Sequence, residues 1–197
     1  MKITAVILAG GRARRMGYVD KALLPIHGKP LIEYVIERIK PQVSHIVINT
    51  HQADAAYERF GYPIITDLDD SRQGPLWGIA SALRQLKVEN MLILPCDVPR
   101  FPRHLVRTLE EKFNTRGVDL CMAHDGERIQ PLLALMHAGF LQHIENCLAR
   151  KCFAVERCFT SANYALAYFE NAVDDFMNLN EPRHIKLFEQ KCNEPDN

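Results

Sequence analysis

The chain has 197 residues, 47% of them hydrophobic and 24% charged, which is enough for one domain with a sizeable core. Its 24 basic and 24 acidic side chains give a formal net charge of zero, which argues against a general nucleic-acid or membrane-surface binder. The apolar run at residues 3–8 is too short for a membrane span, and no small-residue cleavage site follows it. A cytoplasmic protein is therefore expected.

The cysteines do not form a metal-binding or disulfide pattern in the sequence. None of the six belongs to a C-x-x-C pair, and several lie within apolar runs. Reduced, mostly buried thiols are expected, in preference to a disulfide framework or a zinc site. The positions are Cys96, Cys121, Cys147, Cys152, Cys158 and Cys192.

Short apolar runs alternate with helical patterns through the first half of the chain. Residues 3–8 predict a strand buried on both faces, and a polar, glycine-rich loop follows to about residue 29. Pro30 suits the first turn of a helix that Pro41 ends. In chain order the pattern then predicts a strand at 45–49, a short helix at 53–60, a strand at 63–66, a helix at 76–86, a strand at 91–94 and a helix at 103–113.

The second half gives a more mixed pattern. Strands are predicted at 120–123, 132–136 and 165–169, with helices at 140–148 and 181–188. Residues 150–163 show no clean period and are left unassigned. We expect a single domain over residues 1–192, followed by a polar tail at 193–197.

The alternation of strands and helices predicts an α/β fold: a three-layer sandwich with a mostly parallel, Rossmann-like sheet. In such folds ligands bind beyond the carboxyl ends of the strands. Four polar or glycine positions lie at or just after predicted strand ends, namely Gly10, Asn49, Asp67 and Asp97. These residues are predicted to converge on one crevice.

The loop after the first strand has the composition of a phosphate site. Gly10 and Gly11 allow backbone N–H groups to approach a phosphate chain closely, and three arginines with Lys21 can neutralise a triphosphate. A tight turn with a solvated basic face explains the same residues. The loop matches neither G-x-x-x-x-G-K-[ST] nor G-x-G-x-x-G, so it indicates neither a standard NTPase nor a dinucleotide fold.

Asp97 is the candidate metal ligand. It follows a buried strand, and Pro95 and Pro99 restrain the backbone on either side of it. Mg²⁺ is commonly held by one or two carboxylates together with substrate phosphates, so a single aspartate is sufficient. The alternative role for this residue is to cap the next helix.

The motif L-A-G-G-x-x-x-R-M-G-x-x-D-K at residues 8–21, followed by G-K-P-L at 28–31, resembles the signature of nucleotidyltransferases of the sugar-nucleotide pyrophosphorylase type. Its particular form resembles the molybdenum cofactor guanylyltransferases, the MobA family. The resemblance covers nearly the whole chain. It continues in the family's order through residues 47–49, 67, 74–78, 95–99, 124–128 and 178–182.

This resemblance implies transfer of GMP from GTP to the phosphate of Mo-molybdopterin, with Mg²⁺ as cofactor and no covalent intermediate. It implies that Arg15, Lys21 and Asp97 are catalytic, with Asp97 as the ligand of the metal. The nucleotide would be bound by Leu8, Ala9 and Gly10 at the guanine and ribose, by Gly11, Arg15 and Lys21 at the phosphates, and by Asn49 and Asp67, which help to select it. Asn178 and Asn180 would lie near the metal or the pterin.

Other residues carry two interpretations. His124 and Arg128 could bind the anionic pterin or belong to a polar β-turn, and Trp77 could be a core residue or a wall of the site. The implied partners are GTP and Mo-molybdopterin, with molybdoenzymes or cofactor-delivery proteins as docking partners. No nucleic acid or membrane is implied, and a monomer is expected.

One segment departs from the family pattern. The family has a Gly-Glu-Arg-Arg-like turn ahead of the last strand, whereas this chain has Ala-Arg-Lys-Cys-Phe-Ala at residues 149–154. This departure concerns the acceptor side and leaves GTP binding untouched. Alternatives to guanylyl transfer are a relative that uses CTP or a sugar-phosphate acceptor, and a non-catalytic nucleotide-binding protein. Gly11 favours a purine nucleotide, because the cytidylyl relatives resemble Leu-Ala-Ala-Gly at this point.

Overall fold

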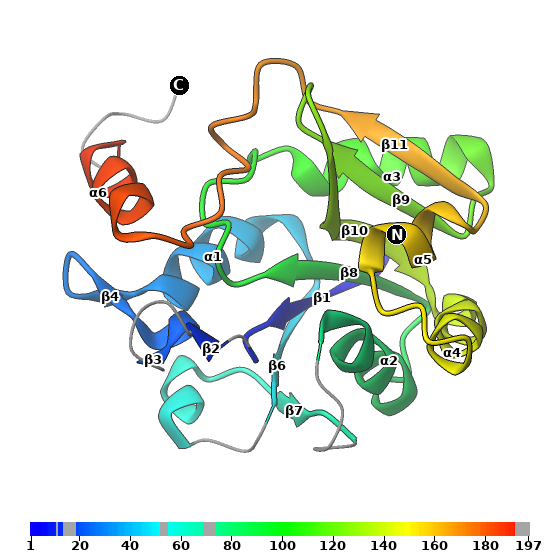
Figure 1. The fold of residues 1–197 in the computed structure, drawn as a ribbon, viewed down its shortest axis with the longest axis horizontal. Helices are drawn as coiled ribbons and strands as arrows, with labels where there is room; N and C mark the ends of the chain where they lie inside the picture. Colours follow the sequence, from blue (N-terminus) through cyan, green and yellow to red (C-terminus); the bar gives the residue numbers. More distant parts are fainter. Residues whose placement is uncertain (11, 14–18, 52–54, 69–73, 192–197) are drawn as a thin grey trace.

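The computed structural model describes residues 1–10, 12–13, 19–51, 55–68 and 74–191 of the chain. Its centre is a seven-stranded sheet with the order β11-β9-β10-β8-β1-β6-β7 (Figure 1). Gly11, Arg15 and the predicted tail at 193–197 lie outside the described residues. The strands of the sheet are β1 (Ile3–Leu8), β6 (His45–Thr50), β7 (Ile64–Thr66), β8 (Asn90–Pro95), β9 (Leu120–His124), β10 (Ile129–His137) and β11 (Tyr164–Tyr168).

The sheet is mostly parallel, as predicted. β1 pairs in parallel with both β6 and β8, and β7 continues the parallel arrangement beside β6. β10 is antiparallel to β8 and β9, while β11 is parallel to β9. The carboxyl ends of β1, β6, β7 and β8 therefore meet at one edge of the sheet.

Helices cover both faces and complete the predicted three layers (Figure 1). α1 (Leu31–Ile39) and α3 (Leu105–Arg116) pack on one face. α2 (Pro75–Gln85), α4 (Leu141–Ala149) and α5 (Val155–Thr160) pack on the other. α6 (Pro182–Lys191) lies outside these layers and packs through Phe188 against Ile26 and Leu31.

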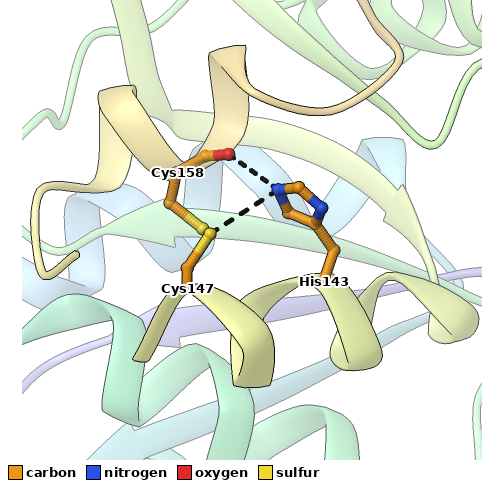
Figure 2. A group of neighbouring side chains, drawn as sticks. All are labelled: His143, Cys147 and Cys158. Atoms are coloured by element: carbon orange, nitrogen blue, oxygen red, sulfur yellow. Dashed lines mark hydrogen bonds between the residues drawn. The ribbon is translucent and has the colours of Figure 1, made fainter. Parts of the chain in front are cut away.

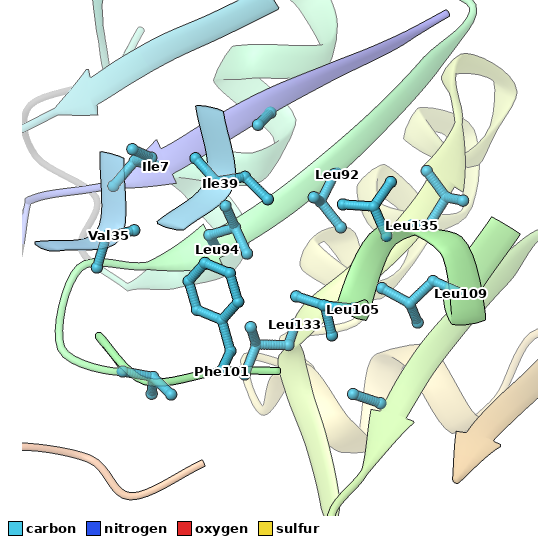
Figure 3. Packing of buried hydrophobic residues seen from close by; sticks show 14 of the residues in the cluster. Ile7, Val35, Ile39, Leu92, Leu94, Phe101, Leu105, Leu109, Leu133 and Leu135 are labelled. Atoms are coloured by element: carbon cyan, nitrogen blue, oxygen red, sulfur yellow. The ribbon is translucent and has the colours of Figure 1, made fainter. Parts of the chain in front are cut away.

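The continuous apolar composition of the central strands follows from this layering. Side chains alternate between the two faces of a strand, so Ile7 of β1 joins the core beneath α1 and α3. Its neighbour Val6 joins the core beneath α2 and α4. Figure 3 shows the first of these cores, where Leu92 and Leu94 of β8 lie between α1 and α3. Both faces are apolar because both faces are covered.

The structure differs from the sequence predictions mainly at short elements. The predicted loop after β1 contains the two-residue strands β2 (Arg12–Ala13), β3 (Val19–Asp20), β4 (Pro25–Ile26) and β5 (Lys29–Pro30) and the 3-10 helix η2 (Lys21–Leu23). Pro30 belongs to β5 and precedes α1 instead of lying in its first turn. The unassigned segment contains α5, a helix of six residues and too short to show a period.

The described cysteines agree with the expectation of mostly buried thiols. Cys96, Cys121, Cys147 and Cys158 are buried, Cys152 is half-buried, and all five are free. Cys192 lies outside the described residues. Within the part of the chain that the structure describes, no helix is long and apolar enough to cross a membrane.

Candidate active site

A cavity of about 310 Å³ lies at the carboxyl edge of the parallel strands. Its lining comes from the ends of β1, β6, β7 and β8, from the beginning of α2, and from one residue each of η2 and β10. The residues are Leu8, Gly10, Lys21, Asn49, His51, Asp67, Gly74, Pro75, Gly78, Pro95, Cys96, Asp97 and Leu132. The four strand-end positions singled out in the sequence thus meet in one cavity, and that prediction is confirmed.

Lys21 is positioned by the short elements that follow β1. Asp20 caps η2 by accepting a hydrogen bond from the backbone N–H of Ala22 at 3.1 Å. The hydroxyl of Tyr57 lies 2.7 Å from the other carboxylate oxygen of Asp20 and fixes its direction. Lys21 itself is only 7% exposed, so its ammonium is held inside the site.

Three distant parts of the chain meet at the Lys21 ammonium. Nζ donates to Asp97 Oδ2 at 2.6 Å and also to Oδ1 of Asn180. The backbone N–H of Leu179 donates to the carbonyl oxygen of Asp97 at 2.8 Å, which ties the segment of Asn180 to the end of β8. A buried ammonium is tolerated when its donors are satisfied by such oxygens. The positively charged ammonium of Lys21 therefore lies in contact with two hard oxygen atoms, one from Asp97 and one from Asn180.

Asn49 and Asp67 form a second polar group on the opposite side of β1. Asn49 Nδ2 donates to Asp67 Oδ1 at 3.3 Å, and His51 Nδ1 lies 3.2 Å from Asp67 Oδ2. Each carboxylate oxygen of Asp67 thus has a partner that restricts its orientation. A carboxylate fixed in this way can accept hydrogen bonds from the N–H or hydroxyl groups of a ligand.

Two glycines keep the cavity open. A Cβ atom on Gly78 would lie 2.7 Å from Asn49 Oδ1 and 3.3 Å from Asp67 Oδ1. A Cβ atom on Gly10 would lie 3.1 Å from the backbone nitrogen of His51. Real Cβ contacts are almost never as short as the one at Gly78, so a side chain there would force the Asn49 amide, and with it the Asn49–Asp67 contact, to move.

Cys96 also lines the cavity but is unsuited to covalent chemistry. Burial, with a smaller effect from the neighbouring Asp97 carboxylate, raises the pKa of the Cys96 thiol well above its usual range. The thiol is therefore neutral, whereas nucleophilic catalysis needs the thiolate. Cys96 is therefore not an activated nucleophile.

Most of the predicted site residues that the structure describes are brought together, with two exceptions. Leu8, Gly10, Lys21, Asn49, Asp67 and Asp97 line the cavity, and Asn180 reaches it through Lys21. Ala9 is buried and donates its N–H to the carbonyl of Asn49 at 2.8 Å, so it supports the site from behind. Asn178 is half-buried and lies beside Leu179, without a place in the cavity lining.

Sequence reasoning did not single out His51 or Leu132. His51 lies one residue beyond the end of β6, and this position after a strand end was the available signal. Leu132 belongs to β10, whose antiparallel pairing with β8 could not be read from the sequence. The sequence allowed Trp77 to be either a core residue or a wall of the site. In the structure it is half-buried and packs against the core beneath α2. It also lines a separate open cavity with Arg84, Lys151 and Phe153.

The side chains of His124 and Arg128 make contacts within the β9–β10 turn. Asp125, which is 0% exposed, accepts hydrogen bonds at 2.8 Å from the backbone N–H groups of Glu127 and Arg128 and at 2.6 Å from Gln130 Nε2. The N–H of Gly126 donates to His124 Nδ1 at 3.1 Å, and Arg128 Nε lies 3.5 Å from Asp125 Oδ2. These contacts favour the turn interpretation of both residues.

Replacing Asp125 by alanine is expected to lower the free energy of unfolding by about 2–4 kcal/mol, because three accepted hydrogen bonds are lost in a buried turn. Urea denaturation of the wild-type and variant proteins measures the difference. Asp119→Ala, at a half-exposed carboxylate beside His137, is the matched control and should change stability by less than about 1 kcal/mol. Equal stability of Asp125→Ala and wild type would contradict the account of the turn.

The same carboxylate makes stability depend on pH. Burial alone would raise the pKa of Asp125, but the N–H groups of Arg128 and Glu127, the Gln130 amide and the Arg128 charge together lower it below its usual value. A depressed pKa in the folded state stabilises the protein above the unfolded value of about 3.9, and this contribution is lost as pH falls through the folded pKa. The stability difference between wild type and Asp125→Ala should therefore shrink below about pH 4.

The mostly parallel α/β sheet has at its carboxyl edge a glycine-lined cavity that holds a lysine–aspartate pair, an arrangement that suits a phosphorylated ligand. Comparison with known proteins places the chain more narrowly. Residues 5–163 match the family of MobA-like NTP transferase domains. The described fold is similar to molybdopterin-guanine dinucleotide biosynthesis protein A from Archaeoglobus fulgidus, with a TM-score of 0.79, 23% identity, and coverage of 96% of this chain and 98% of that one.

Curated relatives give the family. A protein of Shewanella putrefaciens is 39% identical over 180 residues, which are 91% of this chain and 92% of the relative. A protein of Yersinia pestis is 40% identical over 189 residues, which are 96% of each chain. Both are named molybdenum cofactor guanylyltransferase. This chain therefore belongs to the molybdenum cofactor guanylyltransferase family.

Proposed function

We propose that this chain transfers GMP from GTP to Mo-molybdopterin and releases pyrophosphate. Family membership supports the reaction, and one structural observation supports the site. Lys21 and Asp97, which are 76 residues apart in the sequence, are joined at 2.6 Å inside a cavity at the carboxyl edge of the sheet. This is the position where parallel α/β sheets bind ligands, and its charges suit a nucleoside triphosphate.

The reaction proposed is a direct displacement at phosphorus. An oxygen of the acceptor's terminal phosphate forms a bond to the α-phosphorus of GTP, and the bond from that phosphorus to the bridging oxygen of the β-phosphate breaks. The electron pair leaves with pyrophosphate. The attacking oxygen is already anionic near neutral pH, so no general base is required. Catalysis then depends on positioning and on stabilisation of the developing negative charge.

The chain's own residues fit these two tasks. The Lys21 ammonium is held by Asp97 and Asn180 at a fixed point, where it can contact phosphate oxygens without a large rearrangement. Asp67, oriented by Asn49 and His51, accepts hydrogen bonds from the nucleoside part of the substrate. Gly10 lines the cavity at the end of β1, where its backbone can contact the ligand.

The donor atoms also fit Mg²⁺. The carboxylate of Asp97 and the amide oxygen of Asn180 converge on one cationic centre, and both are hard oxygen donors of the kind that Mg²⁺ prefers. Asp97 would hold the ion, with Asn180 near it. When bound, Mg²⁺ neutralises phosphate charge and orients the triphosphate. Asp97 thereby has two roles, to fix Lys21 and to bind the metal.

Nucleotide selectivity tests the proposal. Titration of the purified chain with GTP, ATP, CTP and UTP in Mg²⁺, followed by calorimetry, should give measurable binding of GTP that is at least about tenfold tighter than that of the other three, about 1.4 kcal/mol. Tighter binding of CTP or UTP would move the chain to the relatives that use a pyrimidine nucleotide. The absence of binding of every nucleotide would contradict the enzymatic proposal.

A further inference from the structure

A group of sulfur and nitrogen donors lies outside the active site, where α4 meets α5. His143 and Cys147 belong to α4 and are four residues apart, so both face the same side of that helix. Cys158 belongs to α5 and points toward them (Figure 2). One donor atom from each residue lies within 4.8 Å of the other two. In the described part of the chain, three metal-ligating side chains thus surround one point.

The spacing of these donors suits a tetrahedral ion. His143 Nε2 and Cys147 Sγ are 3.6 Å apart. With zinc bonds of about 2.3 Å to sulfur and about 2.1 Å to nitrogen, a tetrahedral angle separates the two donors by about 3.6 Å, and two sulfurs by about 3.8 Å. The donors therefore need only small side-chain movements to bind one ion.

Burial and chemistry favour a borderline or soft cation over Mg²⁺. Cys158 is 0% and Cys147 is 8% exposed, whereas His143 is half-buried and gives access from the surface. Two thiols and an imidazole are the ligand types that select zinc, while Mg²⁺ prefers oxygen. The backbone N–H of Cys152 donates to the carbonyl oxygen of Cys147 at 2.9 Å, but the Cys152 sulfur is not one of the three donors that lie within 4.8 Å of one another. Water can supply the fourth ligand of a tetrahedral site.

A bound ion would take the place of the hydrogen bonds that His143 Nε2 makes in the structure. Nε2 lies 2.9 Å from the carbonyl oxygen of Cys158 and 3.1 Å from Ser161 Oγ. A carbonyl oxygen only accepts, so Nε2 carries a proton in this arrangement. Ser161 Oγ donates to the same carbonyl at 2.7 Å, which leaves it satisfied when the imidazole turns its nitrogen to a metal. The proton of the ring then lies on Nδ1, the tautomer in which Nε2 is a ligand.

We propose that His143, Cys147 and Cys158 bind one Zn²⁺ ion, which fastens α4 to α5. The ion would fix the intervening turn, residues 150–154, where the chain departs from the family pattern. This turn carries Lys151, at a positive φ of 59°, and the exposed Phe153. Both line an open cavity of about 580 Å³ together with Trp77 and Arg84. Zinc would therefore hold the wall of this cavity in place, separately from the active site.

Metal titration of the full chain tests the proposal. Reduced, metal-free protein is titrated with Co²⁺, and the expected result is one equivalent bound with the intense visible absorption of tetrahedral, thiolate-ligated cobalt. One equivalent of Zn²⁺ should abolish this absorption and raise the Tm of the metal-free protein. Cobalt held by Asp97 would have oxygen ligands and would lack the thiolate bands, so the two sites are distinguished.

Variants connect the absorption to the named residues. Cys147→Ala and His143→Asn should each weaken zinc binding by at least about tenfold, because the loss of a ligand costs no less than the roughly 10–100-fold that follows the loss of a residue hydrogen-bonded to a ligand. Cys121→Ala changes an equally buried thiol on β9 and serves as the matched control, with full metal binding. GTP binding should be unchanged in His143→Asn. The proposal is overturned if the wild type shows no thiolate band, or if the band persists in both Cys147→Ala and His143→Asn.

Discussion

Replacing Asp97 by alanine is expected to reduce guanylyl transfer by roughly 10³-fold, because one change removes both the proposed metal ligand and the anchor of Lys21. The effect should appear mainly in kcat, since the lost interactions act on charge that develops in the transition state. Steady-state release of pyrophosphate measures it. Calorimetry provides a second readout: the variant should bind GTP equally well with and without Mg²⁺, whereas the wild type should bind it more tightly with the ion.

Two controls separate catalysis from folding. Removing one partner of a fully buried ion pair costs about 3–5 kcal/mol, and the cost is smaller here because 21% of the Asp97 side chain is exposed. Asp97→Ala is therefore paired with Asp97→Asn, which keeps an oxygen for Lys21 to contact. Asp119→Ala removes a carboxylate at the amino end of β9, on the opposite edge of the sheet, and should retain full activity. Near-normal turnover of a folded Asp97→Asn protein would exclude Asp97 as the residue that holds the metal.

Replacing Lys21 by methionine is expected to weaken GTP binding by roughly 10²-fold, because the substrate phosphates lose a positioned, buried cation. Methionine has a similar length and tolerates burial, so it fills the space of the lysine stem. The loss of affinity should arise only from contacts with the phosphate groups of GTP. Binding of guanosine, which has no phosphate, should therefore be almost unchanged, and competition titrations with GTP and guanosine measure the difference.

Lys112→Met is the matched control for this change. Lys112 is exposed on α3, beyond the active-site cavity, and its replacement should leave the affinity for GTP unchanged. A Lys21→Met protein that binds guanosine and GTP with equally reduced affinity would point to damage of the whole cavity. That result would contradict a specific contact between Lys21 and the triphosphate.

The sequence predicted the parallel half of the fold well because two independent rules act there. β-branched and apolar runs such as Ile3–Leu8 identify strands buried on both faces, and the carboxyl ends of parallel strands must meet at one edge. Together they located Asn49, Asp67 and Asp97 in one cavity. The basic composition of the loop after the first strand added Lys21, and the resemblance to the family added Asn180, which no local periodicity indicates.

Other features depend on contacts that a local pattern does not contain. Asn180 contacts Lys21, which is 159 residues away in the sequence. Its position is set by the N–H of Leu179, which donates a hydrogen bond to the carbonyl oxygen of Asp97. The helix α5 is only six residues long, so its apolar positions do not repeat often enough to show a period. The pairing of His143 and Cys147 with Cys158 depends on how α4 and α5 pack, and the cysteine spacing alone indicated no site.

The order of strands in the sheet has a consequence for synthesis of the protein. The first 95 residues supply β1, β6, β7 and β8, which are adjacent in the finished sheet. A nascent chain of this length can therefore assemble one continuous parallel half before β10 has been translated. Until then β8 is an unprotected edge, and its unpaired backbone can recruit strands of other chains. The interval between translation of β8 and of β10 is thus the stage at which this edge is open to pairing with another chain.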